Sequence, residues 1–488
     1  MAGLSKSRIL IHRQCPKRLW LQIHQPKLAV EEADSTARIE TGNRVGDLAR
    51  SLHPDGVLID GENLSHALAD TASALKGKRR PLFEATFQAG GVLVRADLLL
   101  PVRGGFDLVE VKSSSSVKDY HLEDAAIQAW VAGKAGLPVK RTKIAHIDTA
   151  FVYRGDEDFQ GLFAHEDISD AVAACTKSIP KWIKAAQRTL AGDEPEVEPG
   201  EQCHKPFPCP FSDYCSPDQS KGYPPEILPK AVAAQLRAAG YNDLRKVPQK
   251  ALTRPKHLRI LRATKSGKAE LDPQAGEQLR TLGYPRYFMD FETIQFAVPI
   301  WPGTRPYVQE PFQWSCHIEK RAGKISHKAF LADGSGDPRR AFAESLVKVL
   351  KTDGPILVYH APFERDRMRY LAETYPDLAP ALLAAIERMV DLLPIAREHY
   401  YHREMRGSWS LKAVLPTIAP ELAYDGMDVA NGGMAQAAFS EILDRETRPK
   451  RRAALRKSLL DYCERDTWAM VEISRFFMNG SGTEPCKP

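Results

Sequence analysis

The chain has 488 residues, of which 43% are hydrophobic and 27% charged, and its formal net charge is +6. This is the balance of an ordinary soluble globular protein, long enough for two to four domains. No run of residues approaches the ~18 apolar residues of a membrane-spanning helix, and no apolar stretch with a cleavage site follows the N-terminus. These features exclude a membrane protein, predict a cytoplasmic location and permit an anionic partner.

The first pattern along the chain is a set of four cysteines. A helix predicted from Leu4 ends or kinks at Cys15, because the residue before a proline disfavours the helical conformation. Cys203, Cys209 and Cys215 follow far downstream, with five residues in each gap. Three clustered thiolates need a fourth ligand, and Cys15 is the best candidate. Because zinc ligands usually come in pairs two to four residues apart, the spacing favours an iron–sulfur cluster held by four cysteines, with structural zinc as the alternative. The other cysteines are interpreted as unligated: Cys175, Cys316, Cys463 and Cys486.

Between these cysteines, a predicted β-hairpin brings a second set of polar side chains together. Its two strands are rich in aliphatic residues and are separated by the turn sequence Val-Arg-Gly-Gly. With residues 102–105 as the loop, antiparallel pairing places Asp97 directly opposite Glu110, and Lys112 faces the same side. The two carboxylates can bind Mg²⁺, and the lysine can stabilise charge that develops on a phosphate. A surface ladder of ion pairs is the alternative.

These residues resemble a known nuclease family. Asp97, then Glu110-Val-Lys112, then a helix carrying Gln128 resemble the motifs of the RecB-like branch of the PD-(D/E)XK nucleases. Iron–sulfur members of that branch carry one cysteine before the nuclease core and three after it, as this chain does. The resemblance implies that residues 1–220 form a restriction-endonuclease-like α/β/α domain with a catalytic metal site and a 4Fe–4S cluster. The chain lacks the histidine of an early helix and the tyrosine that ends the glutamine motif in that branch.

The middle and the end of the chain are predicted from their patterns. Residues 221–280 are expected to form a helical linker between the two halves. Residues 281–480 follow the order strand, strand, strand, helix, strand, helix. Residues 481–488 are expected to be a disordered tail.

Polar residues at the ends of predicted elements mark the C-terminal half. Asp290 and Glu292 end a strand and point to the same face, because side chains alternate along a strand. Two carboxylates on one face suit a divalent metal. Glu364 lies in the first turn of a helix that follows a buried strand, so its carboxylate can reach the strand ends. Tyr462 and Asp466 are four residues apart and share one face of a helix.

In this order, the three stretches resemble the three motifs of the DnaQ-like exonuclease superfamily, in the branch with tyrosine before the last aspartate. The segment Ser-Leu-Lys412 resembles one found between the second and third motifs. The resemblance covers about residues 284–477. It implies a ribonuclease-H-like α/β sheet on which four carboxylates hold two Mg²⁺ or Mn²⁺ ions. Glu364 stands where the family usually has aspartate, which keeps the charge but moves the ligand.

Together the two resemblances imply an α/β chain with two nuclease domains, an arrangement similar to that of a bacterial family of unknown function. The expected activity is phosphodiester hydrolysis, by a 3′→5′ exonuclease in the C-terminal half and a RecB-like nuclease in the N-terminal half. The expected partner is nucleic acid, with DNA favoured over RNA. One alternative is a nucleic-acid-binding scaffold whose N-terminal domain is inactive, and another is a ribonuclease of RNA turnover.

Overall fold

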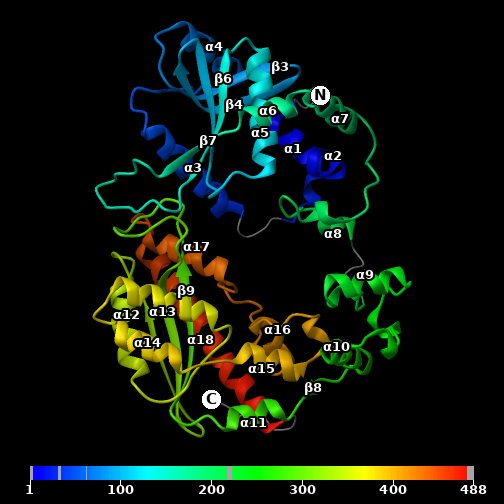
Figure 1. The fold of residues 1–488 in the computed structure, drawn as a ribbon, viewed down its shortest axis with the longest axis vertical. Coiled ribbons are helices and arrows are strands. Elements are labelled where there is room, and N and C mark those ends of the chain that lie inside the picture. Colours follow the sequence, from blue (N-terminus) through cyan, green and yellow to red (C-terminus); the bar gives the residue numbers. More distant parts are fainter. Residues whose placement is uncertain (1–3, 31–34, 62, 217–221, 481–488) are drawn as a thin grey trace. The chain divides into compact units, whose positions relative to one another are not determined.

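A computed structural model shows two compact units, each with a mixed sheet and helices (Figure 1). The first unit comprises Met1–Asp218 together with Phe296–Val308, and the second comprises Gln219–Gln295 together with Gln309–Pro488. The chain is therefore mixed α/β, as predicted. The tail predicted to be disordered and Cys486 lie outside the part of the chain that the structure describes. The described residues are 4–30, 35–61, 63–216 and 222–480.

Unit 1 is organised around one sheet in the order β2-β3-β4-β5-β6-β7, with β1 paired to β4. Strand β4 is antiparallel to both of its neighbours, β3 and β5. Strand β6 lies parallel to β5, and β7 is antiparallel to β6. The strands are β1 (Leu4–Ser5), β2 (Val57–Leu58), β3 (Leu82–Ala89), β4 (Val92–Val102), β5 (Gly105–Lys112), β6 (Val139–Ile147) and β7 (Phe163–Asp167).

Helices cover both faces of this sheet. Leu108 on β5 faces a core shared with α1, α5 and α7, whereas its neighbour Val109 packs with Ala49 of α3 on the opposite face. This alternation along β5 places the sheet between two helical layers. The helices are α1 (Lys6–Gln14), α2 (Pro16–His24), α3 (Ser35–Ser51), α4 (Leu64–Lys76), α5 (Asp119–Lys134), α6 (Ser169–Thr176), α7 (Ile179–Ala191) and α8 (Ser212–Cys215).

The hairpin of β4 and β5 has the predicted register. Pro101 pairs with Phe106, so the strands continue towards Asp97 and Glu110 in the expected alignment. The loop is shorter than predicted, because Val102 and Gly105 also pair and leave only two residues in the turn. Gly104 in this turn has φ +78°, a conformation that glycine adopts without steric cost.

Residues 296–308 belong to unit 1 although they connect two strands of unit 2. Ala297 and Val298 are buried in a cluster of unit 1. The segment also pairs with a loop of that unit, because Gly303 N–H donates to Tyr153 O at 2.7 Å and Tyr153 N–H donates to Thr304 O at 3.0 Å. The second domain is therefore not the continuous stretch 281–480 that the sequence suggested.

Unit 2 contains a sheet in the order β11-β10-β9-β12-β13. Strands β9, β10 and β11 are antiparallel, and β12 and β13 run parallel to β9. Tyr287, Met289 and Phe291 of β9 face one core, and Phe288 faces the other. The strands are β9 (Arg286–Ile294), β10 (Glu310–Arg321), β11 (Lys324–Leu331), β12 (Ile356–Val358) and β13 (Met389–Asp391).

The long helix α18 covers one face of this sheet, and α12, α13 and α14 cover the other (Figure 1). No helix of the described residues is both long and apolar enough to cross a membrane. The helices after β9 are α12 (Arg339–Leu350), α13 (Pro362–Thr374), α14 (Ala379–Glu387), α15 (Leu392–His399), α16 (Leu411–Val414), α17 (Gly432–Leu443) and α18 (Pro449–Asn479).

Residues 221–280 are not a separate linker but part of unit 2. Leu236, Leu261 and Leu279 are buried in the same core as Met470 of α18. These short helices bury their apolar faces against α18 and its neighbours, so the segment forms part of the core of unit 2. Its elements are α9 (Lys230–Ala238), α10 (Pro255–Ser266), α11 (Gln274–Arg280) and β8 (Glu270–Leu271), which pairs with β14 (Tyr400–Tyr401).

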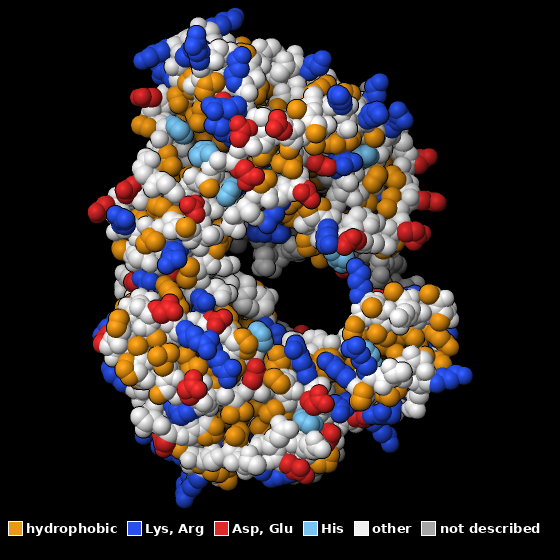
Figure 2. All heavy atoms as spheres, viewed as in Figure 1, with side chains coloured by type: hydrophobic (Ala, Val, Ile, Leu, Met, Phe, Trp, Pro, Cys, Tyr) orange, Lys and Arg blue, Asp and Glu red, His pale blue; other side chains and the backbone are white. Residues whose placement is uncertain are grey.

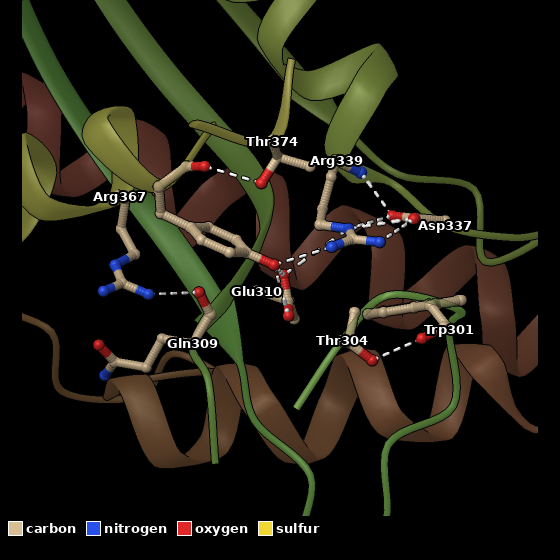
Figure 3. A network of polar contacts seen from close by, with 9 residues as sticks. Trp301, Thr304, Gln309, Glu310, Asp337, Arg339, Arg367 and Thr374 are labelled. Atoms are coloured by element: carbon tan, nitrogen blue, oxygen red, sulfur yellow. Dashed lines mark hydrogen bonds and ion pairs between the residues drawn. The ribbon is translucent and has the colours of Figure 1, made fainter. Parts of the chain in front are cut away.

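A buried polar network anchors the start of β10, where the chain returns to unit 2 (Figure 3). Tyr370 of α13 donates to Glu310 at 2.9 Å and accepts from Arg339 Nη1 at 2.8 Å. Arg339 also donates to both carboxylate oxygens of Asp337. Burial raises the pKa of Glu310 to about 7, although the Arg339 charge opposes the rise. This network ties β10 to α12 and α13.

Candidate catalytic and metal-binding sites

The N-terminal site forms where β4, β5 and α5 meet. Asp97 lies on β4, Glu110 and Lys112 on β5, and Gln128 on α5. Lys112 Nζ donates to Glu110 Oε1 at 2.6 Å, and Gln128 Nε2 donates to Glu110 Oε2. The backbone N–H of Val111 donates to Asp97 Oδ2 at 2.8 Å. The structure thus brings together all four side chains that the sequence pointed to.

Two further side chains, Lys6 and Asp124, belong to this cluster and were missed from the sequence. Lys6 Nζ lies 2.9 Å from Glu110 Oε1 and 3.1 Å from Asp124 Oδ1, and Asp124 Oδ2 accepts from Lys112 at 2.6 Å. Asp124 could have been found, because it precedes Gln128 by four residues on one helical face. Lys6 could not, because it lies 104 residues from Glu110 and no local pattern links them.

The charges of this cluster nearly balance. Burial raises the pKa of Asp97 to about 8; Glu110 adds to the rise, and the nearby lysines oppose it. Burial also acts on Glu110, but Lys112 and Lys6 outweigh it and lower its pKa. Burial and the Glu110 charge thus favour the protonated form of Asp97, while two lysines face the ion-paired Glu110 and Asp124. Binding of a divalent cation here must displace the Asp97 proton.

The four predicted cluster cysteines line one pocket of unit 1. Cys15 joins α1 to α2, and Cys215 ends α8. The backbone N–H of Cys209 donates to Cys203 O at 2.8 Å, which closes the loop between them. The structure therefore gathers one cysteine from the start of the chain and three from the end of unit 1.

Side chains near Cys15 hold these distant segments together. Gln14 Nε2 donates to the carbonyl of Gln202, 188 residues away, at 2.8 Å, and to that of Phe207 at 2.6 Å. Lys17 Nζ lies 2.8 Å from Glu194 Oε1. The pocket is thus built by contacts beyond the cysteines themselves.

The pocket offers four sulfur donors, the ligand set of a 4Fe–4S cluster or of a structural zinc ion. All four cysteines are free thiols with partial exposure. Burial raises the pKa of Cys209 and Cys215, and neighbouring thiols add to the rise. If a cluster binds in this pocket, its iron atoms would be held by the thiolates of Cys15, Cys203, Cys209 and Cys215.

In unit 2, four carboxylates from three segments converge on the α18 side of the sheet. Asp290 and Glu292 lie on β9, Glu364 in the first turn of α13 and Asp466 on α18. Asp290 is partly buried and the other three are buried. Glu364 Oε2 is buried and has no hydrogen-bond partner among the described residues. The structure brings all four predicted carboxylates together, and an unpartnered buried carboxylate oxygen is suited to a cation.

Burial raises the pKa of all four carboxyl groups, and crowding adds to the rise at Asp290, Glu292 and Glu364. Burial and then Asp466 raise the pKa of Asp290, and burial and then Asp290 raise those of Glu292 and Glu364. Burial raises the pKa of Asp466 to about 6, although hydrogen bonds and Lys412 oppose the rise. The site therefore concentrates negative charge that one or two divalent cations would neutralise.

Tyr462 lies beside Asp466 at this site, one helical turn before it. Its hydroxyl accepts from Lys412 Nζ at 3.0 Å. Burial and then the nearby Asp466 carboxylate raise the pKa of Tyr462. Lys412 also donates to Ala430 O at 2.5 Å. The ring of Tyr462 lies 6.2 Å from that of Tyr424, so the tyrosine belongs to the polar site. The sequence resemblance named Lys412 only as part of the Ser-Leu-Lys segment, and the structure adds its hydrogen bond to Tyr462.

Tyr424 and Cys463 also reach this site and were missed. Tyr424 OH donates to Asp466 Oδ1. Cys463 Sγ lies 3.9 Å from Asp290 Oδ2, and Asp290, Glu292 and Cys463 offer ligand atoms within 4.8 Å of one another. From the sequence, Cys463 was interpreted as unligated, but the structure places its thiol against the carboxylates. No short-range pattern distinguishes Cys463 from a core cysteine.

Asp391 explains how Glu364 is presented. Its carboxylate accepts from the N–H groups of His360 and Ala361 at 3.0 and 2.9 Å, in the turn that precedes α13. Because Pro362 fits the first turn of a helix, α13 starts directly after this turn and directs Glu364 inward. Asp366, a neighbouring carboxylate, is exposed and pairs with Arg369. Glu364 is therefore the carboxylate of this segment that enters the site.

The crowded carboxylates predict a pH-dependent effect of metal on stability. Folding raises the pKa of these carboxyl groups, so the folded protein binds protons more tightly than the unfolded chain does. For Asp466, the stabilisation from this proton binding is fully present below the unfolded pKa of 3.8 and is lost as pH rises through about 6. We expect Mg²⁺ or Mn²⁺ to raise the Tm of unit 2 more at pH 8 than at pH 5, measured by calorimetry. Asp290→Asn should shrink this difference, and an equal metal effect at both pH values would contradict it.

A family model described as a domain of unknown function (DUF2779) matches residues 287–410. The match includes β9, with Asp290 and Glu292, and α13, with Glu364, and it ends before α18. No curated protein matches the chain.

Proposed function

We propose that the protein is a metal-dependent nuclease whose main catalytic site is the carboxylate cluster of unit 2. The observation that carries this proposal is the meeting of Asp290, Glu292, Glu364 and Asp466 with the Lys412–Tyr462 pair. Three separate segments contribute acids to one point, three of the four carboxylates are buried, and such a group is costly unless a cation neutralises it. The order of strands around β9 also supports the ribonuclease-H-like fold that the motifs imply.

Asp290, Glu292, Glu364 and Asp466 would hold two Mg²⁺ or Mn²⁺ ions, which when bound activate water and stabilise the leaving oxygen of a phosphodiester. Tyr462 would orient the water. One lone pair of its hydroxyl oxygen accepts from Lys412, so a second lone pair remains to accept a proton of the water. The 3′→5′ direction rests on the resemblance to DnaQ-like exonucleases.

We further propose a second, RecB-like hydrolytic site in unit 1, with Asp97 and Glu110 as metal ligands, Lys112 facing the phosphate and Gln128 orienting Glu110. One observation favours the alternative, in which unit 1 only binds nucleic acid. Lys6 and Lys112 already balance the charges of Glu110 and Asp124, so this site needs a cation less than the site of unit 2 does.

The proposed partner of both sites is nucleic acid, with DNA favoured over RNA. Figure 2 shows Lys and Arg side chains on the viewed face of each unit, interspersed with Asp and Glu. The net charge of +6 is compatible with a polyanion but does not select one. The proposed cofactors are Mg²⁺ or Mn²⁺ and a 4Fe–4S cluster, with the cluster as a structural link. A cytoplasmic location is proposed with them.

The discriminating experiment measures degradation of labelled single- and double-stranded DNA and RNA with Mg²⁺ or Mn²⁺. Wild-type protein should shorten at least one substrate from its 3′ end, and Asp290→Asn should remove that activity. No cleavage of any substrate by wild-type protein with intact metal sites would contradict the proposal.

Lys112→Met tests the site of unit 1. The substitution keeps the length of the side chain but removes the charge that would stabilise a phosphate, so we expect loss of one nuclease activity by roughly 10²–10³-fold. The 3′→5′ shortening should persist, because Lys112 lies outside unit 2. Lys118→Met, on the same unit, serves as the control. If every cleavage rate is unchanged in Lys112→Met while nucleic-acid affinity falls, unit 1 is a binding scaffold.

A further inference from the structure

A second group of metal-ligand side chains lies in unit 2, apart from the carboxylate cluster. It consists of His317 on β10, His327 on β11 and Glu464 on α18, whose ligand atoms all lie within 4.8 Å of one another. The two imidazole rings are 4.6 Å apart between centroids, and His327 Nδ1 lies 3.5 Å from Glu464 Oε1. Three donors from three different elements therefore face one point.

Buried hydroxyl groups hold both imidazoles from behind. His317 Nδ1 lies 2.9 Å from Thr467 Oγ1, and His327 Nε2 lies 2.9 Å from Ser315 Oγ. Both hydroxyl side chains are fully buried. A hydrogen bond on the outer nitrogen of each ring is the arrangement that orients histidine ligands around metals.

This hydroxyl network can be fully satisfied with one particular pair of histidine tautomers. Thr467 Oγ1 lies 3.1 Å from the carbonyl of Glu464, an acceptor that takes its single proton. Ser315, 2.8 Å away, then donates to Thr467 Oγ1, so the Ser315 oxygen is left to accept from a histidine. The hydroxyls therefore accept from His317 Nδ1–H and from His327 Nε2–H.

With these tautomers, the remaining ring nitrogens carry lone pairs. Nδ1 of His327 then lies 3.5 Å from Glu464 Oε1, and both atoms are acceptors with no proton between them. His317 lines an open pocket together with Glu464, Asp461 and Trp468. Two acceptors that face each other beside a third are stabilised by a cation.

We propose that His317, His327 and Glu464 form a binding site for one divalent transition metal. Two imidazoles and one carboxylate are a ligand set that suits Zn²⁺, and imidazole donors disfavour Mg²⁺. The fourth position opens into the pocket, where water or an exogenous anion completes a tetrahedron. The site is separate from the carboxylate cluster, because Glu464 and Asp466 are two residues apart and their side chains leave α18 about 160° from each other.

The metal ties the β10–β11 hairpin to α18. Since α18 also carries Tyr462 and Asp466, occupancy of this site stabilises the helix that presents part of the carboxylate cluster. A ligand that binds only the folded protein raises its Tm by mass action.

The test is Zn²⁺ binding by untagged full-length protein in the Asp290→Asn background with millimolar Mg²⁺. Stoichiometry and affinity are measured by equilibrium dialysis with metal analysis, in parallel with Tm. Glu464→Gln and His327→Gln are the test variants, and Glu472→Gln, on the same helix outside the group, is the matched control. Because every variant keeps the four cysteines of unit 1, any zinc bound there cancels in the comparison.

We expect the background protein and Glu472→Gln to bind one Zn²⁺ more than His327→Gln, and Glu464→Gln to bind that ion at least about tenfold more weakly. Zn²⁺ should raise Tm more in the first two than in the others. Glu464 is about half exposed, so its variant is expected to fold even if the histidine variant does not. Equal zinc stoichiometry, affinity and Tm shift in Glu464→Gln and Glu472→Gln would overturn the proposal and leave a hydroxyl-bonded histidine pair.

Discussion

Asp290→Asn is expected to abolish 3′→5′ exonuclease activity together with tight metal binding at the cluster of unit 2. The substitution keeps the shape of the side chain but removes one of four charges that hold the ions. The loss should reach the background of the assay, measured by single-turnover cleavage of labelled DNA and by calorimetric titration of Mn²⁺. An Asp290→Asn protein that keeps wild-type metal affinity and rate would contradict the assignment of this cluster.

Tyr462→Phe is the matched comparison. It removes only the hydroxyl that lies between Lys412 and Asp466, so metal and substrate binding should persist while the single-turnover rate falls by roughly 10²–10⁴-fold. A tyrosine that merely packs in the core would change stability and leave the rate intact. A wild-type rate in Tyr462→Phe, alongside an inactive Asp290→Asn, would refute a role in orienting water.

Cys15→Ala is expected to remove the iron–sulfur cluster and to destabilise unit 1. In the proposed cluster, Cys15 is the ligand from the start of the chain, and its link to Cys203 would close a loop of nearly two hundred residues. Closing such a loop restricts the unfolded chain by about 5 kcal/mol in the chain-entropy description. The measurements are iron and sulfide per chain after anaerobic purification, and denaturant unfolding of the full-length protein.

Cys175→Ala is the control for this loss, because Cys175 lies on α6 and does not line the cluster pocket. The control should keep the iron and sulfide content of the wild type and its stability to denaturant. Purified wild-type protein that carries one zinc per chain, without iron or sulfide, would replace the cluster by the zinc alternative.

Short-range geometry explains why several site residues could be predicted from the sequence. Asp290 and Glu292 share a face because strand side chains alternate, and the β4–β5 register follows from one turn. Tyr462 and Asp466 share a face because a helix repeats every 3.6 residues. In each case, the residues that must meet lie within about fifteen positions of one another.

Residues that approach from distant segments could not be predicted in this way. Lys6 reaches Glu110 across 104 residues, and Lys412 reaches Tyr462 across 50. Cys463 resembles a core cysteine in sequence, and only the packing of α18 on β9 places its thiol beside Asp290. Periodicity indicates which face a side chain occupies, but not which distant segment covers that face.

The sequence by itself determined the mixed α/β class, the hairpin register and the shared faces of the candidate carboxylates, because each depends on local backbone geometry. The tertiary structure decided that residues 221–280 join the core of unit 2 and that residues 296–308 belong to unit 1. It also decided which lysine side chains face each set of acids, and it brought His317, His327 and Glu464 together. These features depend on the burial of apolar surface between segments far apart in the chain, and local patterns do not encode which segments meet.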